Sequence, residues 1–161
     1  MTAGDNITID EINVISSTGG GGGGLNAVFN YKNDVAVTIN NQYVIYSVKE
    51  TDTYDAMNTT SGEYTIPVDG IYYFTFTIII PVNSNTFGKI YKNGTAPTDQ
   101  INGKGEYAYY SSNIQWTEHS FFGVSQCVQG DIIRVYAKTG RLEADSATRK
   151  QTNLFIGFKI Q

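Results

Sequence analysis

Short runs of Val, Ile, Tyr, Phe and Thr recur along the chain from residue 25 onward, separated by clusters of Gly, Asn, Asp and Ser. This spacing, without any helical period in the apolar positions, is typical of a β-sandwich or barrel. The expected strands are 27–31, 35–39, 43–48, 63–67, 71–80, 86–91, 107–110, 114–128, 132–138 and 154–160. The pairs Asn93-Gly94 and Gly130-Asp131 favour tight turns between them. The chain is therefore predicted to be all-β, with about ten short strands.

The strand expected at 71–80 has an unusual alternation. Its even-numbered positions are apolar or aromatic, which predicts that they face a core, whereas its odd-numbered positions are half apolar rather than charged. The last strand has the same excess of large side chains. The residues expected in the core are Tyr72, Phe74, Phe76, Ile156 and Phe158. The residues expected to face outward are Tyr73, Thr75, Thr77, Ile79 and Phe155. This outward side is too apolar for a solitary sandwich.

The N-terminal part differs from the rest of the chain. Residues 7–9 and 14–16 are two very short strand-like pieces, and a hairpin of this size is not stable alone. Segment 1–18 is therefore either disordered or completed by copies from neighbouring chains. A polyglycine hinge is expected at Gly19, Gly20, Gly21, Gly22, Gly23 and Gly24. Six such residues span roughly 13 Å as a flexible coil, which separates segment 1–18 from a head at 25–161.

Composition excludes several classes of partner. The net charge is −4 and the sequence pI is about 4.8, so no positive field attracts nucleic acid. The longest apolar run, 74–82, is too short to span a bilayer, and no membrane insertion is expected. The first residues lack the basic start and apolar core of a signal peptide, so we expect synthesis in the cytosol. Cys127 is the single cysteine, which excludes a disulfide within the chain.

Catalytic chemistry has little support in the sequence. His119 is the single histidine and no Gly-x-Ser-x-Gly turn presents a nucleophile, so we expect no enzyme. One cysteine and one histidine cannot form a structural zinc site. Acidic residues in the expected loops leave glycan hydrolysis as an alternative. Aromatic residues that are candidates for ligand contact are Tyr107, Tyr109, Tyr110 and Trp116.

Four blocks carry a resemblance to a known family. They are Ala27-Val28-Phe29, "GEYTIPVDGIYYFTF", "CVQGDIIRVYAK" and "LFIGFKI". In order and spacing they resemble the globular head of the first complement component, the C1q-like domain, over essentially 25–161. That resemblance implies a ten-stranded jelly roll related to tumour necrosis factor, assembled as a homotrimer. The outward residues Tyr73, Thr75, Thr77, Ile79 and Phe155 are then the expected trimer interface.

The same resemblance bears on metal binding and function. Some family heads bind calcium through loop acids, which makes Glu143 and Asp145 weak calcium candidates, and no other cofactor is expected. Segment 1–18 is similar to segments in tail-fibre and spike proteins of bacteriophages and large DNA viruses. The expected function is a non-enzymatic trimeric head of a virion or surface fibre that attaches to a host protein or glycan. Segment 1–18 would bind other fibre or virion proteins.

Two further functions stay open. The chain could be a structural capsid decoration or minor coat protein that docks through its N-terminal segment. It could also be a secreted ligand or a spore-surface protein of the same fold.

Overall fold

The computed structural model describes residues 7–9, 15–17, 27–81, 84–95, 99–101, 108–110, 116–142 and 153–161. The strands of the head are β3 (Val28–Lys32), β4 (Val37–Tyr43), β5 (Val48–Asp52), β6 (Met57–Asn58), β7 (Glu63–Thr65), β8 (Gly70–Pro81), β9 (Ser84–Thr86), β10 (Gly88–Lys92), β11 (Ala108–Tyr110), β12 (Trp116–Cys127), β13 (Ile132–Leu142) and β14 (Leu154–Lys159). The prediction of an all-β fold is confirmed. In the described residues, no helix is long and apolar enough to cross a membrane.

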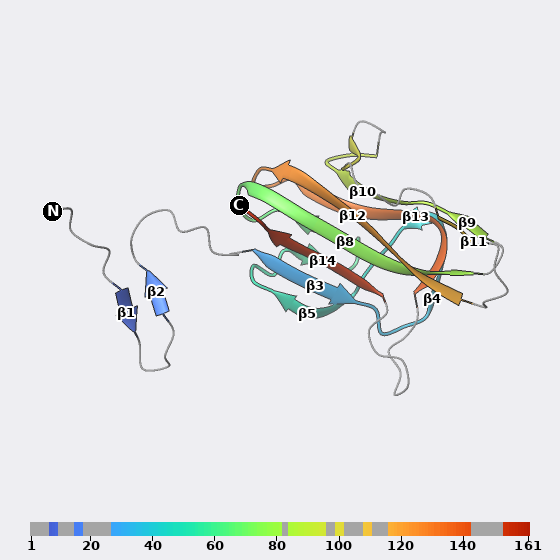
Figure 1. Cartoon of the computed structure of the whole chain (residues 1–161), viewed down its shortest axis with the longest axis horizontal. Helices are drawn as coiled ribbons and strands as arrows, with labels where there is room; N and C mark the ends of the chain where they lie inside the picture. The colour runs from blue at the N-terminus through green and yellow to red at the C-terminus, as the bar shows by residue number, and fades with distance from the viewer. Residues whose placement is uncertain are drawn as a thin grey trace.

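The strands of the head form two layers (Figure 1). One layer has the order β5-β3-β14-β8-β12, and every pair in it is antiparallel. The other layer is built around β13, which pairs with β4, β7 and β10. The layers join where Arg141 of β13 pairs with Ile79 of β8. The fold is thus a jelly-roll sandwich whose first and last long strands, β3 and β14, lie side by side.

Aromatic side chains fill the space between the layers. Phe29 stacks on Tyr64 with ring centroids 3.9 Å apart, and Phe76 stacks on Phe121 at 4.9 Å. Tyr72, Phe74 and Phe76 are all buried, as the alternation along β8 predicts. Tyr64 belongs to the layer of β13 and Phe29 to the layer of β8, so their stacked rings join the two sheets.

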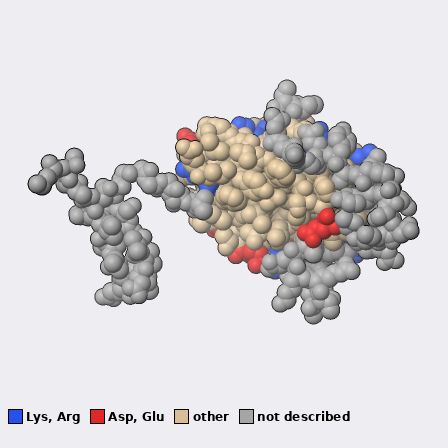
Figure 2. Space-filling model, viewed as in Figure 1, with Lys and Arg blue, Asp and Glu red and all other residues tan. Residues whose placement is uncertain are grey.

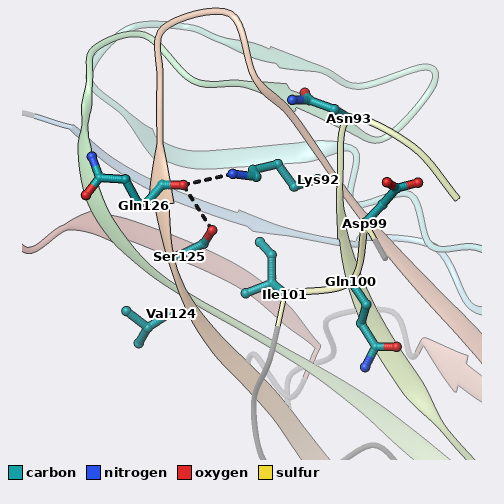
Figure 3. A pocket seen from close by; sticks show the side chains of 8 residues that line it. All are labelled: Lys92, Asn93, Asp99, Gln100, Ile101, Val124, Ser125 and Gln126. Atoms are coloured by element: carbon teal, nitrogen blue, oxygen red, sulfur yellow. Dashed lines mark hydrogen bonds between the residues drawn. The ribbon is translucent and has the colours of Figure 1, made fainter. Parts of the chain in front are cut away.

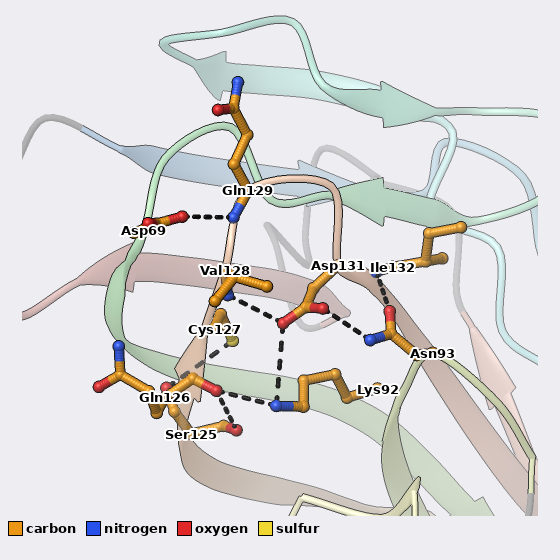
Figure 4. Close-up of polar contacts among 10 residues, drawn as sticks. All are labelled: Asp69, Lys92, Asn93, Ser125, Gln126, Cys127, Val128, Gln129, Asp131 and Ile132. Carbon is orange, nitrogen blue, oxygen red and sulfur yellow. Dashed lines mark hydrogen bonds and ion pairs between the residues drawn. The ribbon is translucent and has the colours of Figure 1, made fainter.

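A polar network fixes one end of the sandwich, where β10 meets the turn from β12 to β13 (Figure 4). The buried Asp131 carboxylate accepts hydrogen bonds from the Val128 backbone N–H at 2.9 Å and the Asn93 side-chain amide at 2.6 Å. The Asn93 carbonyl oxygen accepts from the Ile132 N–H at 2.7 Å, and Asn93 itself has a φ of 62°. Lys92 Nζ lies 3.8 Å from the same carboxylate. These contacts hold the end of β10 against the turn between β12 and β13.

The N-terminal hairpin is formed by β1 (Ile7–Ile9) and β2 (Ile15–Ser17), which pair antiparallel. The second strand starts one residue later than the sequence pattern predicts. The expected hinge, Gly19 to Gly24, lies outside the described residues.

Candidate functional site

One side of the sandwich is apolar and faces away from the core. We define the outer face as the side of β3, β14, β8 and β12 that points away from β13. Its residues are Val28, Asn30, Lys32, Tyr73, Thr75, Thr77, Ser120, Phe122, Val124, Leu154, Ile156 and Phe158, with Lys32 and Ser120 towards one end. Figure 2 shows a broad area without Lys, Arg, Asp or Glu over these strands, with charged residues at its margins. Solvent-facing sheets normally alternate toward polar residues, so this face has the composition of a covered surface.

Aromatic contacts organise the outer face around Tyr73. Its ring lies 6.2 Å from that of Phe122 on β12 and 5.2 Å from that of Phe158 on β14. Phe122 is still 40% exposed and Val124 is 47% exposed in the single chain. Because the three rings support one another across three strands, they form a continuous apolar surface rather than scattered exposed residues.

The polar groups on this face are mostly satisfied within the chain. The Thr75 hydroxyl donates to the Phe121 carbonyl at 3.1 Å, and the Thr77 hydroxyl oxygen accepts from the Leu154 N–H at 2.8 Å. These threonines can therefore be covered by a partner without losing a hydrogen bond. The buried side-chain oxygen of Asn30 has no hydrogen-bond partner among the described residues. Nothing in the sequence singled out Asn30.

Charged groups begin where the outer face ends. Glu118 on β12 pairs with Ile79 on β8, and Arg141 of β13 pairs with the same residue from the other side. Desolvation by the surrounding protein raises the pKa of the Glu118 carboxyl above its ordinary value. Ile79 was expected at the interface, but it is only 5% exposed, so the single chain already buries it.

The assignment of the last strand to its two faces was wrong. Phe155 was expected at the trimer interface, yet it is 1% exposed and packs in the core, with its ring 4.9 Å from that of Phe29. Ile156 and Phe158 were expected in the core, yet they are half-buried on the outer face. The reason is the position of Gly157, where a Cβ atom would lie 2.2 Å from Phe29 Cε1. Gly157 must therefore face the core. Phe155 lies two residues earlier in the same strand, so it faces the core as well.

Comparison with protein-family models decides the family. The model of the C1q domain matches residues 28–158, which run from the first residue of β3 to the penultimate residue of β14. The chain belongs to the C1q domain family. Domains of this family typically form trimers and bind ligands or receptors, and the fold is that of non-enzymatic binding domains. The resemblance read from the four sequence blocks is thus confirmed.

Solved structures agree with this family at low identity. The globular domain of zebrafish complement 1qA protein is 17% identical with a TM-score of 0.57, covering 84% of this chain and 98% of its own. Murine APRIL at pH 5.0 is 13% identical with a TM-score of 0.55, covering 83% and 98%. Eiger TNF from S. frugiperda is 11% identical with a TM-score of 0.54, covering 84% and 91%. No curated protein sequence matches the chain significantly. These structures support the fold of the C1q domain.

The titratable side chains that could support catalysis are poorly placed in this C1q domain. Burial raises the pKa of the Cys127 thiol to about 11, so the nucleophilic thiolate is scarce at neutral pH. Desolvation lowers the pKa of His119, whose ring packs 4.7 Å from that of Phe121. Among the described residues, no group of three or more His, Cys, Asp or Glu side chains could hold a metal ion.

Several predicted site residues of the C1q domain cannot be placed. Glu143, Asp145 and Tyr107 lie outside the described residues. Tyr109 and Tyr110 belong to β11, which pairs with β9, and Trp116 begins β12 opposite Pro81. The calcium site and the aromatic ligand contact therefore stay predictions.

Proposed function

We propose that this C1q domain forms a homotrimer through its outer face and acts, without catalysis, as the attachment head of a virion or other surface fibre. The observation that carries the proposal is the outer face itself. It is apolar across four strands in a chain that already has a filled core. A second and a third copy would cover that surface.

Energetics favour burial of this face. Burying a Phe, Leu, Ile or Val side chain completely stabilises a protein by about 1.5–3 kcal/mol relative to exposure. Phe122 and Val124 retain close to half of their exposure, so each stands to gain roughly half of that amount in every copy. The satisfied hydroxyls of Thr75 and Thr77 add no desolvation penalty. The net effect is favourable association of identical faces.

The proposed location on a virion or fibre rests on the N-terminal segment. The sequence of residues 1–18 is similar to fibre and spike segments, and it offers two strand pieces to partner chains. In this proposal the assembled head lies on a particle surface. Three heads on one stalk would raise avidity even when each site binds its ligand weakly. Calcium at Glu143 and Asp145 is not needed for this function.

The trimer is tested by one charged substitution in the outer face. We expect the wild-type protein to have a mass of about 53 kDa, three times 17.7 kDa, by size-exclusion chromatography with light scattering. Phe122→Asp should shift it to the monomer, because three carboxylates would enter the apolar contact. The matched control is Val35→Asp, at a residue that is 60% exposed and off the outer face. A wild-type monomer would refute the proposed assembly.

Attachment is tested by comparing the full chain with a variant lacking residues 1–18. If the head carries attachment, both proteins should bind host cells, and only the full chain should associate with particles. If neither binds cells while the full chain still docks onto particles, the structural capsid role replaces attachment.

A further inference from the structure

A cleft of about 460 Å³ opens between β12 and the segment formed by β10 and residues 99–101 (Figure 3). This volume lies within the range of small-molecule sites in proteins. Its walls are formed by the end of β10 at Lys92 and Asn93, by residues 99–101, and by residues 124–126 of β12. The Ile101 side chain lies between the two walls in Figure 3, and Ser125 points toward it from β12.

The backbone of β12 presents hydrogen-bonding groups to this cleft. Lys92 Nζ donates to the Gln126 carbonyl oxygen at 2.9 Å, so that carbonyl points across the cleft and away from β8. In an antiparallel strand the N–H and C=O of one residue point to the same side, and every second residue repeats the direction. The N–H and C=O of Val124 therefore face the cleft as well. Within the described part of the chain β12 pairs with β8, which lies along the edge of β12 opposite the cleft.

The side chains add both donors and acceptors, and the charges of Lys92, Asp131 and Asp99 sum to −1. Ser125 supplies a hydroxyl oxygen as acceptor, since its proton is donated to the Gln126 carbonyl at 3.1 Å, while Gln100 supplies an amide and Asp99 a carboxylate. The Lys92 ammonium is balanced by Asp131 at 3.8 Å. An anionic ligand therefore meets no uncompensated positive charge. A sugar hydroxyl, which donates and accepts at once, matches this mixture of groups.

The cleft also has an apolar part and rigid walls. The Ile101 side chain lines the cleft and suits the C–H face of a sugar ring, whereas the Val124 side chain points to the outer face and contributes only its backbone to the cleft. Asn93 holds one wall through its bonds to Asp131 and Ile132. A site whose walls are already fixed costs less entropy to occupy than a mobile loop.

We propose that the cleft between β10 and β12 binds a neutral saccharide, through the edge of β12 at residues 124–126 and the polar side chains of residues 99 and 100. This assignment rests on the proposed attachment function, because it names the class of ligand that the head would hold. One such site occurs in each copy of the chain.

The test uses the full-length protein and saturation-transfer NMR with a panel of methyl glycosides of glucose, galactose, mannose and N-acetylglucosamine. The panel also contains 3′-sialyllactose and an unstructured pentapeptide. We expect transfer to at least one neutral glycoside, and an affinity at least 10-fold weaker in the double variant Gln100→Ala, Ser125→Ala. The control Gln129→Ala alters a glutamine on the adjacent turn and should stay within twofold of the wild-type protein.

Three results would overturn the assignment: no glycoside binds at 10 mM, the sialylated sugar or the peptide binds in preference, or the double variant binds as well as the wild-type protein. Light scattering on the same samples separates this site from the assembly. A monomer that still binds glycosides at the cleft would refute the trimer while supporting the saccharide site.

Discussion

Replacing Phe155 with alanine should destabilise the fold far more than replacing Phe158 with alanine. Phe155 is 1% exposed and its ring contacts Phe29 and Tyr46 at 4.9 and 5.8 Å, so its removal leaves a cavity between the layers. A buried Phe→Ala change costs about 3–5 kcal/mol. With a urea m-value of about 2 kcal/mol/M, a loss of 4 kcal/mol lowers the unfolding midpoint by about 2 M.

Phe158 lies on the other side of the same strand and is half-buried in the single chain. Replacing Phe158 with alanine lowers the free energy of unfolding of each chain by roughly 1 kcal/mol, which lowers the urea midpoint by about 0.5 M. Its larger effect should be on assembly. If each of three copies loses about 1 kcal/mol of contact, the trimer dissociation constant rises by roughly 150-fold.

Urea unfolding followed by tyrosine fluorescence, at several protein concentrations, separates the two effects. Assembly makes the midpoint depend on concentration, so only the Phe158→Ala midpoint should approach that of the wild-type chain as the protein is diluted. Equal midpoint shifts for the two variants, or a larger shift for Phe158→Ala at low concentration, would refute the inward direction of Phe155.

Three further changes test local features of the structure. Gly157→Ala should lower the free energy of unfolding by about 1–3 kcal/mol, because the new Cβ would lie 2.2 Å from Phe29 Cε1, and an unchanged thermal melt would contradict this contact. Cys127 should react with a thiol reagent such as DTNB at pH 8 only after denaturant is added, since burial raises its pKa to about 11; rapid labelling of the native protein would contradict its burial. The raised pKa of Glu118 means that the folded state favours the protonated carboxyl, so its stabilising contribution is complete below the ordinary pKa and is lost as pH rises through the raised one. Glu118→Gln should therefore lose less stability than the wild-type protein between about pH 4 and pH 7 in urea titrations, and identical pH profiles would argue against desolvation at this residue.

The sequence predicts the fold class and the inward face of β8 because every even-numbered position of that strand from 72 to 80 is apolar or aromatic. Tyr72, Phe74 and Phe76 all point into the core, and Tyr73 and Thr75 point away from it. The cleft between β10 and β12 could not be predicted, since its walls are brought together by tertiary contacts such as the bond from Lys92 to the Gln126 carbonyl. No local period or motif encodes such a contact across the sandwich.

The error in β14 has a physical cause that also supports the trimer. A strand shows its register through the contrast between a buried face and a wet one, and a slip of one residue exchanges the two faces. In β14 that contrast is absent, because Leu154, Ile156 and Phe158 are as apolar as Phe155 on the inward side. A central strand with one solvent-exposed face normally carries polar residues on that face, not three large apolar ones. The ambiguity that led to the wrong assignment is therefore what a strand buried on both sides should produce, with the core on one face and, in the proposed trimer, a second copy of the chain on the other.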